Sequence, residues 1–309
     1  MTDRVSVFAP SPQLTVTVED LDGNPDVHLH AGGQGFWQAR MIVALGAPVT
    51  LCCALGGETG QVLRHLLAEH DIEVRARDVA ARNGAYVHDR RDGDRDQVVE
   101  QLPDPLTRHE LDDLYELAVI AGLTSGVAVL SGSVDESTEE VVPVSTYERL
   151  TADLVGNGCR VVVDLAGERL SAALAGVPTV VKVSHEELLD DGRADDDSVP
   201  ALTKAARAIV GDGVDLVVVS RAADPTLAVR GDEALLVKGP SLAPVDTRGG
   251  GDSMTAGIAA AFAQGEDVEA ALRLGAAAGA LNITRHGLGS GSGDAVRALA
   301  ERVEITRAG

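Results

Sequence analysis

The sequence predicts an α/β fold in which a mostly parallel β-sheet lies between layers of helices. Short apolar runs, of the kind found in fully buried strands, alternate along the chain with longer segments of helical periodicity. Parallel strands joined by helices cross over right-handed, and this places helices on both faces of one sheet. The length of 309 residues suits one large α/β domain or two smaller ones.

The predicted strands share a high content of Val and Leu and are short. In chain order they are Val5–Phe8, Val49–Leu55, Val127–Leu130, Arg160–Asp164, Thr179–Val183 and Leu216–Val219. The predicted helices are longer, and their apolar residues recur every three to four positions. They are Phe36–Leu45, Thr59–Glu69, Val144–Val155, Val199–Val210 and the small-residue stretch Ser253–Phe262.

Two regions break this rhythm, because their residues alternate between polar and apolar. The first region pairs Leu14–Glu19 with Val27–Ala31, and the second pairs Ala85–His88 with Gln97–Leu102 around the turn-forming sequence Arg90–Asp94. Alternation with a period of two is typical of half-exposed antiparallel strands.

The charge of the chain excludes some partners. Lys and Arg number 26 and Asp and Glu 48, so the formal net charge is −22 and most of the surface repels nucleic acid and anionic lipid. No apolar run reaches the ~18 residues of a membrane span, and Val5–Phe8 is too short for a signal peptide. Cys52, Cys53 and Cys159 lack metal-ligand spacing and fit a reducing compartment. We therefore expect a cytoplasmic protein that binds neither nucleic acid nor membrane.

The most informative segment is Asp246-Thr247-Arg248-Gly249-Gly250-Gly251-Asp252. Three consecutive glycines let the backbone turn and approach a ligand closely. The helix predicted to follow presents unpaired N–H groups and the positive end of its dipole, which favours a bound anion, above all phosphate. Asp252 is then either an N-cap or a general base that removes a hydroxyl proton while the glycine amides hold the phosphoryl charge.

This segment resembles the D-T-x-G-[AG]-G-D signature of the ribokinase-like (PfkB) carbohydrate kinases. Gly32–Arg40 is similar to that family's G-G-K-G-x-N-x-A-R. Ser131-Gly132-Ser133 resembles the S-G-S of the subgroup that contains fructose-1-phosphate kinase and tagatose-6-phosphate kinase. Two more segments resemble motifs of that subgroup and occur in the same order. Asp164 with Gly167-Glu168 is similar to D-x-x-G-E, and Lys182 with Glu187-Leu188 is similar to K-P-N-x-x-E-L. The matches run in family order from about residue 5 to about residue 290.

The resemblance implies a single ribokinase-like domain over residues 1–309, a three-layer α/β/α fold with a small β-sheet lid from about residues 12–31 and 84–102. It also implies a phosphotransferase that uses ATP and Mg²⁺ and accepts a small sugar or sugar phosphate. A lid suits this chemistry because transfer to water competes with transfer to sugar. In the family the lid often clasps a second subunit, so we expect a homodimer through the lid.

On the donor side, the resemblance assigns catalysis to the general base and the anion hole: Asp252, Gly249, Gly250 and Gly251. The positions matched to ATP binding are Lys182, Ser220, Thr247 and Gly251. Glu187 would help to hold Mg²⁺ through water, and its alternative role is that of an ordinary exposed helix residue. Asp246 lies where many family members bind a monovalent cation such as K⁺.

The positions matched to acceptor binding are Gly32, Gly33, Gln34, Arg82, Ser131 and Asp164. Gly32 and Gly33 would bring amides close to sugar hydroxyls, or else form a tight strand-to-helix turn. Ser131 and Asp164 end predicted strands, where ligands of open α/β sheets gather, although a turn residue and a helix cap are the alternatives. Arg82 falls where related kinases bind the acceptor's phosphate, but a lone arginine is more often surface charge.

Some acceptor-side positions depart from the family pattern. Gln34 replaces a lysine, which removes a point charge suited to a phosphorylated acceptor. Trp37 replaces an asparagine, and Ser11–Thr15 resembles N-P-x-x-D without its aspartate. We therefore expect an acceptor other than fructose 1-phosphate or tagatose 6-phosphate.

The nucleotide side departs as well. Ser184 stands where K-P-N-x-x-E has asparagine, and Ser220–Pro225 lacks both glycines of the family's S-x-G-x-x-G loop. Two alternatives to a sugar kinase follow: a sugar- or nucleotide-binding regulatory protein with weakened catalysis, and a nucleoside kinase in which Trp37 stacks on a base. The retained Asp252 argues for an enzyme, and the S-G-S and D-x-x-G-E segments argue for a sugar acceptor.

Two further features of the sequence give weaker indications of function. His28 and His30 would face the same way on a strand, so a metal pair is conceivable. The acidic stretch Asp190–Asp197 is predicted to be a solvated loop.

Overall fold

The computed structural model describes residues 4–93, 95–132 and 141–308, so Ser133 of the S-G-S segment lies outside the described residues. The larger of its two sheets has ten strands in the order β14-β13-β12-β11-β10-β9-β8-β1-β4-β5. They are β1 (Val5–Phe8), β4 (Val49–Gly56), β5 (Glu73–Val79), β8 (Val127–Ser131), β9 (Arg160–Asp164), β10 (Val180–Ser184), β11 (Leu216–Arg221), β12 (Asp224–Arg230), β13 (Glu233–Lys238) and β14 (Glu304–Arg307).

In this spatial order, every neighbouring pair of strands between β11 and β5 is parallel. The strands β12, β13 and β14 add an antiparallel edge. The predicted mostly parallel α/β fold is therefore confirmed. The sequence analysis did not identify β5 or the three edge strands, and the ends of each predicted helix lie within three residues of the ends of an observed helix.

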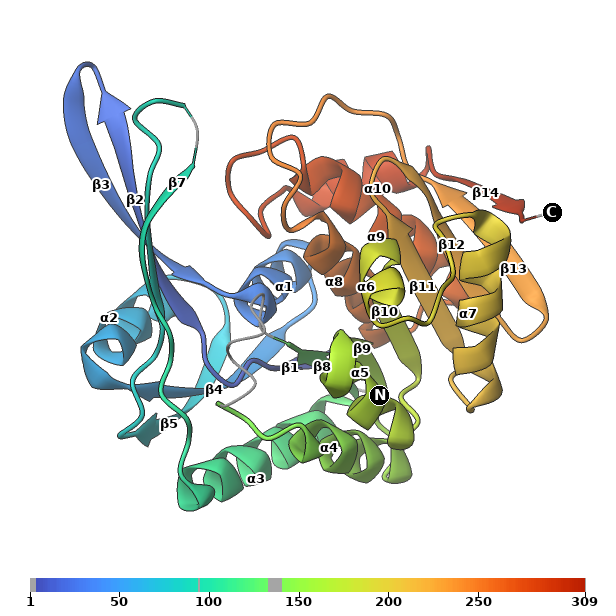
Figure 1. Ribbon diagram of the computed structural model, residues 1–309, viewed down its shortest axis with the longest axis horizontal. Coiled ribbons are helices and arrows are strands. Elements are labelled where there is room, and N and C mark those ends of the chain that lie inside the picture. Colours follow the sequence, from blue (N-terminus) through green and yellow to red (C-terminus); the bar gives the residue numbers. More distant parts are fainter. Residues whose placement is uncertain (1–3, 94, 133–140, 309) are drawn as a thin grey trace.

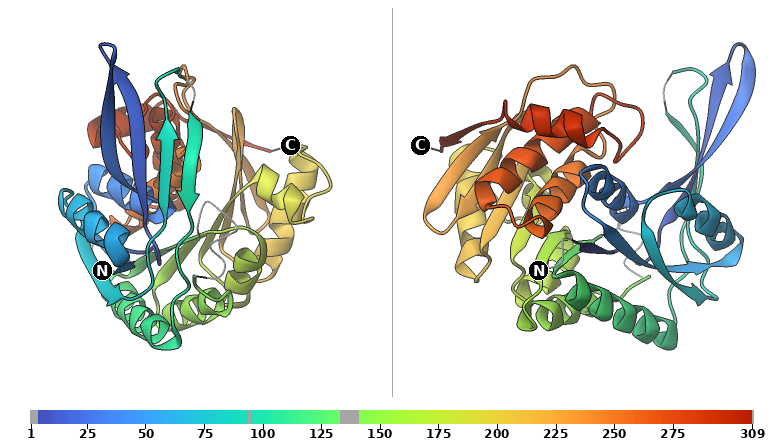
Figure 2. Two further views of the ribbon diagram at one scale, coloured as in Figure 1. Left: turned by 60° about the vertical axis from the view of Figure 1, so that its left-hand side comes forward. Right: turned by 180° about the vertical axis from the view of Figure 1, so that it is seen from behind.

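Helices cover both faces of the larger sheet (Figures 1 and 2). One layer contains α1 (Gln34–Ala44), α2 (Gly57–Ala68), α8 (Gly250–Ala263), α9 (Val268–Asn282) and α10 (Gly293–Ala300). The other contains α3 (Arg108–Ser125), α4 (Ser145–Gly156), α5 (Gly167–Ala175), α6 (His185–Asp190) and α7 (Val199–Gly211).

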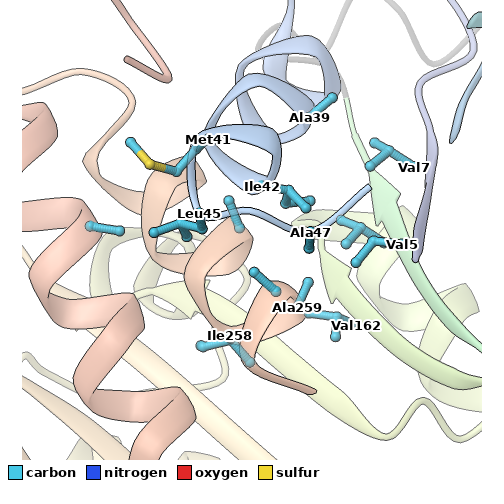
Figure 3. Packing of buried hydrophobic residues seen from close by; sticks show 14 of the residues in the cluster. Val5, Val7, Ala39, Met41, Ile42, Leu45, Ala47, Val162, Ile258 and Ala259 are labelled. Carbon is cyan, nitrogen blue, oxygen red and sulfur yellow. The ribbon is translucent and has the colours of Figure 1, made fainter. Parts of the chain in front are cut away.

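Strand residues alternate between the two cores, as the pleat requires. In β9, Val162 packs with the first layer, and its neighbours Val161 and Val163 pack with the second. Figure 3 shows the first core, where Ile42 of α1 lies near Val5 and Val7 of β1, and Ala259 of α8 lies near Val162 of β9. The three cysteines are free and buried within these cores, where they act as packing residues.

A second, four-stranded sheet projects from one side of the molecule (Figure 1), and we call it the lid sheet. Its order is β3 (Asn24–Gly32), β2 (Gln13–Leu21), β6 (Ala85–Asp89) and β7 (Asp96–Gln101). The hairpins β2–β3 and β6–β7 are antiparallel, but the central pair β2–β6 is parallel. The two pairs predicted to be antiparallel are therefore confirmed, whereas the sequence analysis made no prediction for the central pair, which is parallel. The physical reason is that β2 and β6 follow β1 and β5, whose carboxyl ends lie at the same edge of the larger sheet.

The two faces of the lid sheet differ in character. One face carries the aligned apolar residues Val16, Val18, Val27, Leu29, Val87 and Val99. The opposite face carries Thr15, Thr17, His28, His30, Tyr86 and His88. His28 and His30 do face the same way, with ring centroids 6.0 Å apart, but among the described residues no group of three or more His, Cys, Asp or Glu could hold a metal.

Within residues 4–93, 95–132 and 141–308, no helix combines the length and the apolar character that a membrane span requires. The helices of this protein are instead buried by packing on one another. Helices α8 and α9 approach very closely, because Gly257 faces Gly275 and a Cβ at Gly257 would lie 2.6 Å from the Gly275 Cα.

We expect Gly257→Ala to lower the free energy of unfolding by about 1 kcal/mol. The gain in helix propensity is about 1 kcal/mol, and forcing two backbones apart costs roughly 1–3 kcal/mol. Gly211→Ala in α7 is the matched control, since nothing lies within 4 Å of its Cβ position. Urea unfolding of both variants tests this contact, and equal stabilities would contradict it.

Candidate active site

A cleft of about 690 Å³ separates the lid sheet from the carboxyl ends of the parallel strands. The residues that follow β8, β9 and β10 line one wall, together with the first turns of α1 and α8. The lid wall is lined by Thr15, Tyr86, Arg95 and Glu100. This volume suits a small-molecule site, and ligands of open α/β sheets bind at this edge.

Two helix N-termini open into the cleft. The N-cap of α1 is Gly33 with φ 102°, and that of α8 is Gly249 with φ 69°, left-handed values that favour glycine. Neither helix has a side-chain cap. The first intrahelical bond of α8 runs from Ser253 N–H to Gly249 O, so the preceding amides have no partner within the helix. Both dipoles therefore direct positive charge at the cleft, which favours an anion there.

Asp252 lies in the first turn of α8, where it is half-buried and lines the cleft. Since Gly249 is the N-cap, the capping role considered for Asp252 was wrong. Burial, together with the charges of Asp164 and Glu187, raises the pKa of Asp252 to about 7, although Lys182 and a hydrogen bond from Gln34 oppose the rise. A carboxyl that titrates near neutrality can accept a proton under ordinary conditions.

Beneath Asp252 lies a buried ion pair, in which Lys182 Nζ donates to Asp164 Oδ1 at 3.1 Å. The exposed fractions of the two residues are 5 % and 2 %. Burial alone would lower the pKa of Lys182, but the nearby carboxylates Asp164, Glu187 and Asp252 raise it overall, so the ammonium stays charged.

The Asp164 carboxylate is also bound by two neutral side chains. Its Oδ2 accepts from Gln38 Nε2 at 2.9 Å and from Thr255 Oγ1 at 2.7 Å. The bonding capacity of this carboxylate is thus directed at the protein. Asp164 therefore supports the cleft floor, and because it also belongs to the cleft lining, its contact with the acceptor stays a prediction.

Lys182 also approaches the glycine turn. A Cβ at Gly251 would lie 2.5 Å from Lys182 Nζ, so only glycine lets the ammonium sit against the α8 backbone. Gly249 and Gly251 line the cleft, whereas Gly250 is not part of the lining and packs toward Ile283. The structure thus brings together a fixed positive charge, two of the predicted glycines and Asp252.

Three predicted acceptor residues lie away from the cleft lining. Ser131 is fully buried, and its hydroxyl donates to Gln38 Oε1. Gly32 is buried against Thr15 in the strand-to-helix turn. Arg82 is exposed and binds Asp104 through two bonds of 2.9 and 3.1 Å, so it holds a loop outside the cleft. None of these three belongs to the cleft lining, so their contact with the acceptor stays a prediction. Gly33 and Gln34 do line the cleft.

Asp246, the predicted cation ligand, is already neutralised. Its carboxylate binds Arg248 at 2.6 Å and Arg90 of the lid region at 3.4 Å, and the Arg248 amide also donates to it. This arrangement links the lid to the loop before α8.

Glu187 lines the cleft, and it forms a capping box with Ser184. The Ser184 amide donates to one Glu187 carboxylate oxygen at 2.6 Å, and the carboxylate faces the cleft near Asp252 and Lys182. Carboxylate oxygens are the ligands that Mg²⁺ prefers, so the residues present fit this ion. The replacement of the family's asparagine by Ser184 thus retains a helix cap.

The remaining ATP-binding predictions are less central. Thr247 is exposed, and neither it nor Ser220 belongs to the cleft lining. In the altered loop after Ser220, Ala222 adopts φ 48°. The left-handed turn of the missing glycine is therefore retained, at a strain of about 1 kcal/mol.

Several lining residues were missed by the sequence analysis. Asp190 and Asp191 border the cleft: Asp190 is exposed, as predicted for a solvated stretch, whereas Asp191 is half-buried and accepts a bond from the Gly167 amide at 3.0 Å. Arg95, Tyr86 and Glu100 were also missed, because no motif marks a lid residue. Gln38 could have been found, since it lies one helical turn after Gln34 on the predicted helix.

With this geometry in place, comparisons with known proteins give the family. The pattern of the pfkB family carbohydrate kinases matches residues 8–294. The chain belongs to this family. It is therefore a carbohydrate kinase, an activity that implies ATP and a divalent metal.

Three similar proteins illustrate the relationship. The 1-phosphofructokinase of Bacillus subtilis (strain 168) is 27% identical over 304 residues, which are 96% of this chain and 97% of that protein. The ATP-dependent 6-phosphofructokinase isozyme 2 of Escherichia coli (strain K12) is 31% identical over 253 residues, 80% of each. The crystal structure of phosphofructokinase-2 from Escherichia coli in complex with potassium has a TM-score of 0.85 at 28% identity, covering 98% of this chain and 99% of that one. The ribokinase-like fold is thus confirmed.

We expect Lys182→Met to lower the free energy of unfolding by about 3–5 kcal/mol, because it leaves the Asp164 charge buried without its partner. It should also move the pKa of Asp252 further up, since Lys182 opposes the rise. The double variant Lys182→Met/Asp164→Asn should lose less than the sum of the single variants. Urea unfolding of the wild type, the two single variants and the double variant measures this coupling. Strictly additive losses of unfolding free energy would contradict the ion pair.

Proposed function

We propose that this chain is an ATP-dependent sugar kinase in which Asp252 is the general base and the amides of the α8 N-terminus form the anion hole. The observation that carries the proposal is the convergence, in one cleft, of a carboxyl with a pKa of about 7 and an uncapped helix N-terminus beside Lys182. The proposed acceptor is a small sugar or sugar phosphate, consistent with the phosphofructokinase relatives.

In the proposed reaction Asp252 takes the proton of an acceptor hydroxyl. The oxygen bonds to the γ-phosphorus of ATP as the bond to the β–γ bridging oxygen breaks, which leaves ADP. The amides of Gly249 and Gly251 and the ammonium of Lys182 would stabilise charge on the transferred group. Bound Mg²⁺ would neutralise phosphate charge, and Glu187 would hold it through water.

The acceptor would bind between the α1 N-terminus and the lid. Gly33 and Gln34 contribute amides from the α1 turn, and Gln34 also bonds to Asp252. This interaction gives the residue that replaces the family's lysine a role in orienting the base. The acceptor is still predicted to be neither fructose 1-phosphate nor tagatose 6-phosphate.

Of the ligands expected from the sequence, the monovalent cation at Asp246 has the least support from the geometry. Although one relative's structure is a complex with potassium, the Asp246 carboxylate of this chain binds two guanidinium groups. We propose that these arginines supply the positive charge at this position.

We expect Asp252→Asn to lower kcat by about 10²–10⁴-fold, because the amide cannot accept the hydroxyl proton. Binding of ATP with Mg²⁺, measured by calorimetry, should be retained. The melting temperature should not fall, since a neutral side chain suits this buried position better than a charge. Activity is measured by coupled ADP release across a panel of sugars, and full activity in the variant would exclude Asp252 as the base.

The pH dependence provides the control for this variant. In the wild type, kcat should rise about tenfold per pH unit below pH 7 and level off above it, because only the ionised carboxyl accepts a proton. Residual activity of Asp252→Asn should lack this limb. Binding of ATP without turnover of any sugar would instead favour the regulatory protein.

We further propose a homodimer through the apolar face of the lid sheet. That face exposes large side chains, among them Val27 at 58%, Leu29 at 47% and Val99 at 53%. Contiguous apolar surface of this kind typically marks an interface between proteins.

We expect Leu29→Glu to weaken the dimer by roughly 100-fold, because it places a charge within the apolar contact. The matched control is Ile120→Glu in α3, outside the lid, because the native Ile120 side chain is 50% exposed. Light scattering after size exclusion, run over a dilution series, measures the masses. A monomeric wild type, or identical behaviour of the two variants, would argue against this interface.

A further inference from the structure

The first turn of α8 is held from behind by a side chain of α9. Asn282 is the last residue of α9 and is fully buried. Its amide nitrogen Nδ2 donates to the carbonyl oxygen of Arg248 at 2.8 Å, and its carbonyl oxygen Oδ1 accepts from the Gly289 amide at 2.9 Å. Asn282 is not part of the cleft lining, whereas Arg248 and the following Gly249 are. The side chain therefore contacts the glycine turn on the side that faces away from the cleft.

The orientation of the Asn282 amide is fixed by its two partners. The Gly289 N–H can only donate, and the Arg248 carbonyl can only accept. If the side-chain amide were turned over, two donors would face each other at Gly289 and two acceptors would face each other at Arg248. Buried polar groups without a partner are costly, so only one orientation satisfies both contacts. The Nδ2 group therefore points at the Arg248 carbonyl.

This bond also determines the direction of the Gly249 amide. The peptide bond between Arg248 and Gly249 is trans, so its C=O and N–H groups point in opposite directions within one plane. Because the carbonyl is directed at Asn282 and α9, the N–H is directed away from them. Gly249 lines the cleft, and none of the described residues accepts a hydrogen bond from its amide. The Gly249 N–H is thus directed toward the cleft with its bonding capacity unused.

Gly249 begins a run of amides that one anion can share. It adopts a left-handed conformation, with φ 69° and ψ 3°, and the next residue, Gly250, begins the right-handed α8. Successive N–H groups in such a pair form a concave nest that binds anions. Since glycine has no Cβ, the peptide before Gly249 can flip at little steric cost. A flip would replace the first N–H of the nest with a carbonyl oxygen, which repels an anion, and the bond from Asn282 opposes it.

The other contact of Asn282 connects the glycine turn to α1. Gly289 has φ 61°, and a Cβ at this position would lie 2.2 Å from the Trp37 carbonyl oxygen, so its loop packs directly on the α1 backbone. In the same loop, the Leu288 carbonyl accepts from Arg40 Nη1 at 3.1 Å. One buried side chain therefore positions the two helix N-termini that open into the cleft relative to each other.

We propose that Asn282 is a positioning residue for phosphoryl transfer: it orients the Arg248–Gly249 peptide so that the Gly249 N–H binds the transferred phosphoryl group. This inference rests on the proposed kinase function and deepens the anion hole named there. Asn282 touches neither substrate and acts only through the peptide that it holds. Its loss should therefore affect the transition state, where the anion hole acts, more than it affects the binding of either substrate.

Binding measured without an acceptor tests this role independently of turnover. The probes for calorimetry are ADP with Mg²⁺, and the same mixture with aluminium fluoride, which mimics the transferred phosphoryl group. We expect the wild type to bind the aluminium fluoride complex at least ~10-fold more tightly than ADP. Asn282→Leu should weaken binding of the aluminium fluoride complex by about 10–100-fold and change the affinity for ADP by less than ~3-fold.

Two further variants control for packing. Asn282→Ser retains a small polar side chain that is too short to reach both partners, and it should show the same selective loss if Asn282→Leu fails to fold. Thr284→Val removes a different side-chain bond at the end of α9, which Thr284 Oγ1 donates to the Leu281 carbonyl at 2.7 Å. It should bind both probes as the wild type does. A selective loss in Thr284→Val, or an equal loss of both probes in the Asn282 variants, would overturn the inference.

Kinetics separate this inference from the proposed base. With the sugar that the acceptor panel identifies, Asn282→Leu should lower kcat by about 10–100-fold and change the KM values for ATP and sugar by less than ~3-fold. An unchanged kcat would overturn the inference and leave Asp252 as the base. Full activity of Asp252→Asn, together with a selective loss in the Asn282 variants, would do the reverse. If the wild type binds both calorimetric probes equally, the inference falls together with the anion hole.

Discussion

The cleft depends on the buried pair of Lys182 and Asp164. Two charges at 5% and 2% exposure persist only because they bind each other and because Gln38 and Thr255 satisfy the remaining oxygen of the carboxylate. These residues come from α1, β9, β10 and α8, so one carboxylate joins four elements that are distant in sequence. The pair also sets the charge beneath the first turn of α8, and therefore the proton affinity of Asp252.

The opposing charges around Asp252 explain a pKa near 7 in physical terms. Burial, Asp164 and Glu187 favour the protonated carboxyl, and Lys182 with Gln34 favours the ionised one. Neither group alone would produce a base suited to neutral pH. The same ammonium rests against Gly251, so a single cation acts on both the proposed base and the glycine turn proposed to bind an anion.

The lid sheet shows how two insertions can serve one cleft. Because β2 and β6 leave the larger sheet at the same edge, they pair in parallel and place every second residue over the cleft. The alternation seen in the sequence then has two consequences: Thr15 and Tyr86 face the ligand side, and Val16 and Val87 face away. The Arg90–Asp246 contact ties this sheet to the loop that begins α8.

The sequence by itself determined the parallel α/β architecture, the family and the glycine turn with Asp252. Each of these depends on local pattern: apolar runs, turn residues and a contiguous motif. It also indicated Lys182, Gln34 and Glu187, whose neighbours in sequence carry recognisable signatures.

Only the tertiary structure decided which of these residues face the cleft. Ser131 and Asp164 end adjacent strands, and both are buried polar groups that must find partners: Ser131 turns into the protein, whereas Asp164 borders the cleft and binds Gln38. The sequence does not distinguish Arg82 from Arg95, since both are arginines of the lid region. In the structure Arg82 pairs with Asp104 outside the cleft, whereas Arg95 stacks on Tyr86 within it. Charge and hydrogen-bond partners are set by contacts between distant segments, and those contacts exist only once the sheet and the lid have come together.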